Sequence, residues 1–354
     1  MSSNFYEKDE PLVLGIESTC DETGVALVKG RDLLADVTAS SMNEHARFGG
    51  IIPEIASRAH LESFLPTLSS VLEKTNVDLS QIDAIACSAG PGLVGSLTVG
   101  ISAAKALAVC LNKPIYGVNH VIGHLCVDEL VDGPFPERFI GLIVSGGHSN
   151  LLLINDIAKD IVELGGTLDD AAGEAFDKVG RLVGLPYPGG PHVDRLACLG
   201  DREAIVFPRG LAAGKDKYRH RHNFSFSGLK TAVARYVEML NASGADLPVE
   251  NICAGFSEAV NDSLTAKAVE ACKEFDCNTI VVGGGYSANS RLRQLLVERA
   301  NNAGLIVRMP PLRFCTDNGA QIAALGSNLV RSGVMPSPLC FGPDSSMSLQ
   351  RPCL

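Results

Sequence analysis

The 354-residue sequence contains no tryptophan, and aromatic residues make up only 5% of it. Its eleven cysteines include no Cys-x-x-Cys pair and their number is odd, which argues against a disulfide framework or a cysteine zinc site and favours reduced cytoplasmic thiols. Lys105 or a glycine interrupts each apolar stretch before it reaches 18 residues, so no membrane span is expected. The first ten residues do not resemble a signal peptide.

A surplus of basic charge is also missing. Thirty Lys and Arg against 40 Asp and Glu give a net charge of −10, and the pI is near 5.3. A protein that binds nucleic acid unaided usually has a basic surplus, so this chain avoids nucleic acid, uses a local basic patch or borrows one from a partner. The chain is 46% hydrophobic and 20% charged, which excludes disorder for most of it, and its length predicts two domains.

Three segments combine strand-like apolar runs with turns of small residues. Leu12–Val28 and Phe139–Ile154 each hold two runs, whereas Thr279–Leu296 passes from a strand through glycines into a helix. Strands alternating with helical patterns predict an α/β fold with a duplicated core and two lobes around a nucleotide. Helices are predicted over 51–73, 95–111, 169–183 and 251–275. The first lobe is expected to contain 11–118 plus about 318–354, and the second lobe 119–317. The tail from Met335 is expected to be partly loose.

His120 and His124 have the i, i+4 spacing that places two imidazoles on one helix face, where both can reach one metal ion. The alternative is two unrelated histidines, one capping and one packing. A zincin peptidase would need a glutamate beside the first histidine, and Val121 stands there. Asp317, just before an apparent helix, is either a third ligand or an N-cap.

Two glycine turns, Ser145–Gly147 and Gly283–Gly285, follow strand-like runs and offer backbone N–H groups free of side chains. Such groups bind phosphate or carboxylate, although many glycine pairs are plain turns. Neither turn matches a Walker loop or a Rossmann fingerprint. The loops together favour nucleotide binding.

Acidic residues crowd the segment 166–197. Asp170, Glu174 and Asp177 fall on one face of a predicted helix, and a solvated face is the default interpretation. The Pro-Gly-Gly-Pro breaker at 188–191, with Asp194 soon after it, is more typical of a ligand loop whose carboxylates hold ribose hydroxyls.

One local basic and aromatic run, Lys215–Lys230, combines cationic side chains with Tyr218, Phe224 and Phe226. It predicts either contact with RNA phosphates and bases or a solvated loop that leads into an amphipathic helix. The candidate RNA contacts are Lys215, Lys217, Arg219, Arg221 and Lys230.

Together these segments resemble a known family. The matching motifs run in the family's order from about residue 13 to about residue 325: GIESTCDETGVAL, HARFGGIIPEIASRAH, AGPGLVGSLTVGISAAKALA, NHVIGHL, LIVSGGHSNL, LDDAAGEAFDK, YPGGP, FSFSGLKTAV, GGGYSAN and CTDNGAQIA. The sequence is similar to the bacterial tRNA adenosine threonylcarbamoyltransferases of the TsaD type, once described as sialoglycoprotein endopeptidases. Asn223 departs from the aspartate that is common in the family.

The resemblance implies a two-lobed fold of the actin, sugar-kinase and heat-shock ATPase type with a cleft between the lobes. It implies transfer of a threonylcarbamoyl group from threonylcarbamoyl-AMP to the exocyclic amine of the adenosine 3′ of the anticodon, in tRNAs that read codons beginning with A. It also implies one divalent metal ion per subunit, iron rather than zinc, and two partners, a smaller homologous pseudo-enzyme and an ATPase. A cytoplasmic protein without a membrane partner is expected.

By motif, the resemblance assigns the metal to His120, His124 and Asp317. It assigns the adenylate donor to Ile143, Val144, Ser145, Gly146, Gly147, Asp177, Gly190, Asp194 and Asn289. Residues that support the ligands or handle protons are expected among Glu17, Ser18, Asp21 and Glu22. No protein nucleophile is evident, and the alternative functions are a metal-dependent kinase or peptidase of the same fold.

Overall fold

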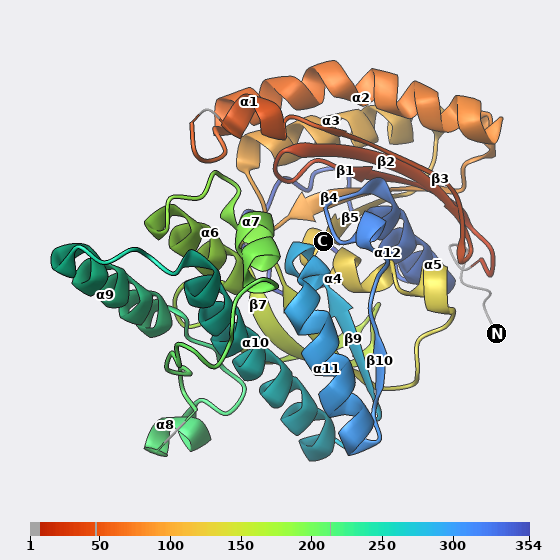
Figure 1. Cartoon of the computed structure of the whole chain (residues 1–354). Helices are drawn as coiled ribbons and strands as arrows, with labels where there is room; N and C mark the ends of the chain where they lie inside the picture. The colour runs from red at the N-terminus through yellow and green to blue at the C-terminus, as the bar shows by residue number, and fades with distance from the viewer. Residues whose placement is uncertain (1–7, 47, 213) are drawn as a thin grey trace. The chain divides into compact units, whose positions relative to one another are not determined.

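The computed structural model describes residues 8–46, 48–212 and 214–354 (Figure 1). The chain forms two compact units, each with one five-stranded sheet. Unit 1 contains the chain up to Phe135, Asn155–Ile161 and Thr316–Leu354, and unit 2 contains Pro136–Ile154 and Val162–Cys315. The α/β class is confirmed. The lobe boundaries near residues 118 and 318 stay a prediction.

The sheet of unit 1 has the order β3-β2-β1-β4-β5. β1 pairs antiparallel with β2 and parallel with β4, and β4 pairs parallel with β5. The central strands are buried almost throughout, as expected for a sheet covered on both faces. The strands are β1 (Leu12–Glu17), β2 (Glu22–Lys29), β3 (Asp32–Ser40), β4 (Ala84–Gly90) and β5 (Ile115–Asn119).

Helices cover both faces of this sheet. Figure 1 shows α2 and α3 on one face and α12 on the other. Gly15 and Gly24 permit the close approach of α12, because a Cβ at either position would overlap its backbone at Ala323 or Gly319. The helices of unit 1 are α1 (Met42–Ala46), α2 (Pro53–Thr75), η1 (Leu79–Gln81), α3 (Val94–Leu111), α4 (His120–Cys126), α5 (Glu129–Asp132) and α12 (Gly319–Arg331).

Helix α3 concerns the argument that every apolar stretch is too short to span a membrane, and the expectation that no span exists stays a prediction. By length and composition alone it is apolar enough to cross a membrane, and Lys105 does not exclude it. In unit 1, however, Leu97, Ile101 and Ala104 are buried in the core that α3 shares with α2 and β4. Core packing therefore explains the apolar residues on this face of α3, whereas Val94 and Val109 are exposed.

The tail from Met335 is packed, so the prediction of a partly loose segment was wrong. Phe341, Met347 and Leu349 are buried. The tail also bonds to β5, since Ser337 N donates to Ile115 O and Leu354 N donates to Gly117 O. Backbone pairing orders this segment despite its proline and serine content.

The sheet of unit 2 repeats the order of the first, β8-β7-β6-β9-β10, with β6 antiparallel to β7 and parallel to β9. The repeated order is the duplicated core that the sequence predicted. Its strands are β6 (Phe139–Val144), β7 (Ser149–Asp156), β8 (Asp160–Gly166), β9 (Thr279–Gly283) and β10 (Ile306–Arg308).

Helix α10 is the main core helix of unit 2, with more than half of its residues buried. Phe256 on this helix packs against Phe176, whose ring also contacts Tyr286 with 5.0 Å between centroids. The helices of unit 2 are α6 (Ala172–Leu182), α7 (Gly189–Ala197), α8 (Gly214–Arg219), α9 (Ser227–Ser243), α10 (Val249–Glu274), η2 (Gly285–Ala288), α11 (Ser290–Ala303) and η3 (Leu312–Phe314). All eleven cysteines are free.

Candidate functional site

The two predicted histidine ligands lie on α4, directly after β5. Asn119 caps this short helix, since its side chain accepts hydrogen bonds from Val121 N at 3.0 Å and Ile122 N at 3.2 Å. Asn119 is fully buried, and its Nδ2 donates to Ser348 O in the tail. The cap and the tail together fix the direction in which α4 leaves the sheet.

Asp317 lies two residues before α12 and is not the cap of that helix. Asn318 is the N-cap, because its side chain accepts a hydrogen bond from Gln321 N at 2.9 Å. The Asp317 carboxylate instead faces the histidines, with Oδ1 at 3.3 Å from His124 Nε2 and 3.6 Å from His120 Nε2. The alternative interpretation of Asp317 as a capping residue is thus wrong.

The three side chains have a geometry that fits one metal ion. One ligand atom from each of His120, His124 and Asp317 lies within 4.8 Å of the other two. Two atoms bound tetrahedrally at about 2.1 Å from one ion lie about 3.4 Å apart, close to the two histidine–aspartate distances. Unit 1 therefore contains a possible metal site, built by the end of β5, α4 and the start of α12.

Glu17, at the end of β1, orients the first histidine. It is fully buried, and its Oε2 lies 2.9 Å from His120 Nδ1. A carboxylate only accepts hydrogen bonds, so Nδ1 carries a proton and Nε2 faces Asp317. Thr19 N donates to Glu17 Oε1 at 2.6 Å and fixes the carboxylate in turn. A histidine held by a carboxylate behind it is typical of metal sites.

The electrostatics of this cluster favour a positive charge. Burial opposes the imidazolium form of His120, but Glu17 and Asp317 outweigh it and raise its pKa to about 9. Burial also opposes the charged form of Asp317, yet the two histidines and Thr19 hold its pKa well below the usual range. The field that favours an imidazolium would also favour a cation bound at Nε2.

The other three predicted supporting residues differ in their contacts. The Ser18 hydroxyl donates to Ser96 O at 3.2 Å and so contributes to packing against α3. Asp21 is 5% exposed, and its Oδ2 has no hydrogen-bond partner among the described residues. Burial, followed by Asp317 and Asp21, raises the pKa of Glu22 above its ordinary value. Asp21 and Glu22 thus add carboxyl groups beside the candidate ligands.

The turn between β6 and β7 in unit 2 has open space beside its two glycines. Ser145 Oγ accepts hydrogen bonds from Gly147 N at 3.3 Å and His148 N at 3.1 Å, which fixes the turn that follows Ile143 and Val144. A Cβ at Gly146 or Gly147 would meet nothing within 4 Å. The turn therefore leaves room for a ligand against its backbone.

Gly284 connects this turn to the loop that follows β9. Its φ of 93° is a conformation that favours glycine, and a Cβ there would overlap Val144 O. The two glycine loops predicted from the sequence are thus adjacent within unit 2.

Asp177 holds the YPGGP loop. Its Oδ1 accepts hydrogen bonds from Gly189 N at 2.7 Å and Gly190 N at 3.1 Å. Burial raises the pKa of Asp177, whereas these two N–H groups oppose that shift. A Cβ at Gly190 would meet nothing within 4 Å. The carboxylate fixes the loop and leaves its surface open.

The solvated acidic stripe of Asp170, Glu174 and Asp177 that was expected on one helix face does not form on α6. Asp170 lies before α6 and pairs with Lys178 at 2.6 Å and Lys230 at 2.7 Å. Lys178 also pairs with Glu174. These carboxylates stabilise the unit through ion pairs.

Asp194 and Asn289 lie in direct contact. Asn289 Nδ2 donates to Asp194 Oδ1 at 2.9 Å. Ser290 donates to the same carboxylate through its hydroxyl, at 2.9 Å to Oδ1, and its backbone N, at 3.1 Å to Oδ2. Three donors thus bind this carboxylate at the junction of α7 and α11, mostly through Oδ1, and Oδ2 keeps capacity for a further donor.

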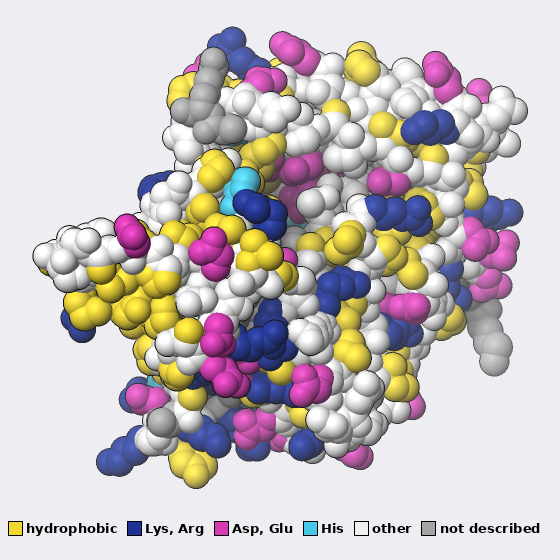
Figure 2. Space-filling view, viewed as in Figure 1, with side chains coloured by type: hydrophobic (Ala, Val, Ile, Leu, Met, Phe, Trp, Pro, Cys, Tyr) yellow, Lys and Arg dark blue, Asp and Glu magenta, His cyan; other side chains and the backbone are white. Residues whose placement is uncertain are grey.

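The five predicted tRNA contacts divide into two sets. Lys215, Lys217 and Arg219 are exposed on α8, where Figure 2 shows dark-blue side chains. The other two are paired within the protein: Arg221 with Glu270 and Glu274, and Lys230 with Asp170.

Sequence reasoning missed several residues that build these sites. Thr19 and Gln321 flank His120, with Gln321 Nε2 at 3.1 Å from Nδ1. Asn261 contacts the amide of Asn289 directly, and Tyr286 bonds to Asn261 behind it. Asn119 had a usable signal, an asparagine just before a helical pattern.

Known proteins resemble this chain over nearly its full length. Residues 32–324 match the family TsaD, tRNA N6-adenosine threonylcarbamoyltransferase. A protein of that name from Bifidobacterium longum is 57% identical over 342 residues, which cover 97% of this chain and 99% of the relative. Another protein of that name, from Corynebacterium diphtheriae, is 51% identical over 347 residues, which cover 96% of this chain and 98% of the relative.

Two solved structures are similar in fold. The crystal structure of HypF from T. kodakarensis has a TM-score of 0.63 and 14% identity, covering 93% of this chain and 49% of that chain. Full-length HypF in its phosphate- and nucleotide-bound form has a TM-score of 0.61 and 15% identity, covering 92% and 47%. The chain spans about half the length of these proteins, and the likeness shows the fold alone.

The family match does not favour the kinase or peptidase alternatives. The enzyme's class follows from the match over residues 32–324 and from relatives more than half identical along nearly the whole chain. The chain belongs to the TsaD family of tRNA N6-adenosine threonylcarbamoyltransferases, transferases that act on tRNA.

Proposed function

We propose that the enzyme transfers a threonylcarbamoyl group from threonylcarbamoyl-AMP to the exocyclic amine of the adenosine 3′ of the anticodon, and releases AMP. The tRNAs concerned read codons that begin with A. The observation that carries the proposal is the cluster of His120, His124 and Asp317, with Glu17 behind it, in a chain of this family.

In this proposal His120, His124 and Asp317 hold one divalent cation per subunit. Two histidines and one carboxylate with open positions hold Fe(II) in non-haem sites and also Zn²⁺ in catalytic sites, so the ligand set suits either ion, and we take iron because the family resemblance implies it. The bound ion would supply Lewis acidity toward donor oxygens. Glu17 holds the His120 ring so that Nε2 points to the ion, and the buried carboxylates stabilise its charge.

The donor's adenylate part is assigned to the loops of unit 2. Asp194 Oδ2 has capacity to accept a hydrogen bond from a ribose hydroxyl, and Asn289 lies beside it. The backbone from Ile143 to Gly147, with Gly190 and the Asp177 that fixes it, leaves space for the phosphate beside its glycines, although Gly147 N and Gly190 N already donate to Ser145 Oγ and Asp177 Oδ1.

The donor is a mixed anhydride, so AMP is already a good leaving group and no protein nucleophile is required. The residues need to hold the incoming amine against the face of the donor carbonyl and to exclude water. Orientation of this kind can contribute roughly 7–11 kcal/mol to lowering the barrier. Fixed N–H groups and charges stabilise the negative charge that develops during attack.

For tRNA, the exposed cations of α8 are the proposed contact, with Lys215, Lys217 and Arg219 available to phosphates. Since the chain carries a net charge of −10, partner surfaces would supply further positive charge. We assign that role to a smaller homologous pseudo-enzyme and an ATPase subunit, in the cytoplasm where tRNA is modified.

The test is the transfer reaction with the full chain, both partners, unmodified tRNA and a radiolabelled threonyl donor. Wild type should incorporate label and contain about one iron per subunit, and the His120→Ala/His124→Ala variant should lose both. Incorporation that survives complete chelation would contradict the metal role. A failure of the metal-loaded wild type to label tRNA, with the partners bound, would contradict the transfer reaction as proposed.

A further inference from the structure

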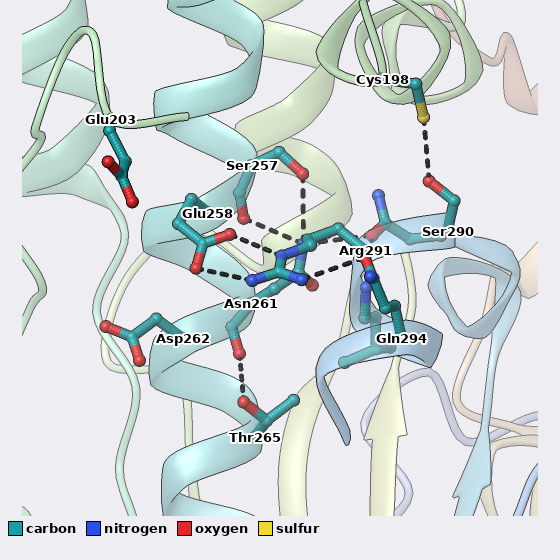
Figure 3. A network of polar contacts seen from close by, with 12 residues as sticks. Cys198, Glu203, Ser257, Glu258, Asn261, Asp262, Thr265, Ser290, Arg291 and Gln294 are labelled. Carbon is teal, nitrogen blue, oxygen red and sulfur yellow. Dashed lines mark hydrogen bonds and ion pairs between the residues drawn. The ribbon is translucent and has the colours of Figure 1, made fainter. Parts of the chain in front are cut away.

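A buried chain of hydrogen bonds leads from the core of unit 2 to Asp194. Tyr286 OH donates to Asn261 Oδ1 at 3.0 Å, Asn261 Nδ2 donates to Asn289 Oδ1 at 3.1 Å, and Asn289 Nδ2 reaches Asp194. Asn261 is fully buried, Asn289 is 6% exposed and Tyr286 is 9% exposed. Figure 3 shows Asn261 on α10 facing the start of α11 beside Ser290 and Arg291.

Each side chain in this hydrogen-bond network has one orientation that satisfies the donors and acceptors beside it. Asn261 Nδ2 also donates to Ser257 O at 2.9 Å, so a flipped amide would place its oxygen against a carbonyl. Asn289 Oδ1 also accepts from Leu292 N at 2.9 Å, which leaves Nδ2 for Asp194. Tyr286 packs against the Phe176 ring, and burial raises the pKa of its hydroxyl so that it stays a donor.

These hydrogen bonds fix the orientation of the Asp194 carboxylate, where the network ends. Asp194 Oδ1 receives Asn289 Nδ2 and the Ser290 hydroxyl, which use its two lone pairs. Among the described residues, Oδ2 receives only the weaker backbone contact from Ser290 N at 3.1 Å. The Asn289 amide thus determines which oxygen of Asp194 remains available to a ligand.

We propose that Asn261, supported by Tyr286, is a positioning residue for donor binding: it fixes the Asn289 amide, and through it the Asp194 oxygen that accepts the ribose hydroxyl. This inference rests on the proposed assignment of the adenylate to Asp194 and Asn289. Asn261 itself does not touch the donor. Its effect falls on donor affinity, because the candidate metal ligands belong to unit 1 and lie outside this network.

The test measures kcat and KM for threonylcarbamoyl-AMP in the full complex, the Kd of AMP by calorimetry, and the metal content. Asn261→Leu keeps the side-chain volume and removes the amide. Loss of one buried hydrogen bond changes an equilibrium by roughly two- to twelvefold, so we expect KM and Kd to rise about tenfold. Tyr286→Phe removes only the hydroxyl and should raise them about threefold. In both variants kcat should change less than twofold and metal content should stay constant.

Two further variants separate the outcomes. Thr265→Val is the matched control, because Thr265 is equally buried on α10 but bonds to the backbone O of Asn261 and to Arg299. It should lower the melting temperature and leave KM unchanged. Asp194→Ala tests the ribose assignment itself and should raise KM at least tenfold.

A raised KM in Asp194→Ala with an unchanged KM in folded Asn261→Leu and Tyr286→Phe would overturn the positioning role alone. An unchanged KM in Asp194→Ala would overturn the ribose assignment and the positioning role together. If kcat and metal content fall in proportion to the loss of stability, and do so in Thr265→Val as well, the role of Asn261 is structural only. If Asn261→Leu does not fold, Tyr286→Phe decides the question by the same criteria.

Discussion

The candidate sites of the two units are built from different chemistry. In unit 1 the groups are charged and buried: Glu17 is fully buried behind His120, and Asp317 faces both histidines. In unit 2 the groups are mostly neutral: backbone N–H groups of open glycines, and the amides of Asn261 and Asn289. The first arrangement suits a cation, and the second suits a nucleotide with many polar atoms.

The comparison also shows how each site is kept rigid. Charged groups of unit 1 constrain one another, so removing a single charge changes the whole cluster. In unit 2 the loops are fixed from behind, by Asp177 under Gly189 and Gly190 and by Asn261 under Asn289. A change of charge should therefore damage the first site most, and a change of shape the second.

Glu17→Gln should have the largest effect, because it removes the charge behind His120 and nearly preserves the shape. Loss of a carboxylate that supports a histidine ligand weakens metal affinity by about 10–100-fold. Titration with Fe²⁺ or Zn²⁺ in competition with a chelator measures it. Glu129→Gln is the control, a glutamate of unit 1 that is 5% exposed and pairs with Arg331 at 2.7 Å.

The control should lower stability and leave metal affinity unchanged. Equal metal affinities for wild type and Glu17→Gln would show that the charge of Glu17 does not contribute to the site, and would remove the main contrast between the units.

How much of this could be predicted differs between the sites. The spacing of His120 and His124 indicated the pair, and the parallel strands explain the rest of unit 1. β1, β4 and β5 are parallel, so their carboxyl ends lie at one edge and bring Glu17 to His120 across 103 positions. The motif resemblance indicated Asp317, whereas its local sequence suited a cap, a role that Asn318 fills.

The support for the loops of unit 2 could not be predicted. Asn261 lies in the middle of a mostly apolar helix, where an asparagine gives no periodic signal, and its partner Asn289 is 28 positions away. The packed tail was missed for a similar reason. Its composition is typical of a loose segment, whereas its order comes from a few buried side chains such as Phe341 and Met347 and from backbone bonds to β5, neither of which composition reveals.

Two matched glycine substitutions sharpen the contrast of shape. Gly146→Ala places a Cβ in open space, so the free energy of unfolding should change by less than about 0.5 kcal/mol. The same methyl group occupies the proposed phosphate cradle, so the KM for the donor should rise about tenfold. Gly24→Ala places its Cβ in the backbone of Gly319 and should lower stability by about 1–3 kcal/mol.

Denaturant unfolding and steady-state kinetics check both variants. A Gly146→Ala enzyme with an unchanged KM would exclude the β6–β7 turn from donor binding. A Gly24→Ala enzyme as stable as wild type would contradict the close packing of α12 on β2.

The smallest expected effect is on the free energy of unfolding, and it comes from a charged group of unit 2 that lies away from the candidate ligand loops. Asp262 on α10 pairs with Arg209 at 2.8 Å and with Arg299. Burial opposes the charged form of Asp262, but the two arginines outweigh it and lower its pKa below the ordinary 3.8. A folded pKa that is lowered means stability that is present above the unfolded pKa and lost as the pH falls through the folded one.

Asp262→Asn should therefore lower the free energy of unfolding by about 1–2 kcal/mol at pH 7, because a hydrogen bond to a charged group contributes about 1.5–3 kcal/mol and solvent screens part of this partly exposed pair. The difference from wild type should begin to shrink near pH 3.8, where the carboxyl of the unfolded chain becomes protonated, and it should disappear below the lowered pKa of the folded state. Urea unfolding of both proteins between pH 7 and pH 3 measures it. A difference that stays constant over this range would mean that packing, and not the charge of Asp262, stabilises the junction of α10 and α11, and donor KM should be unaffected either way.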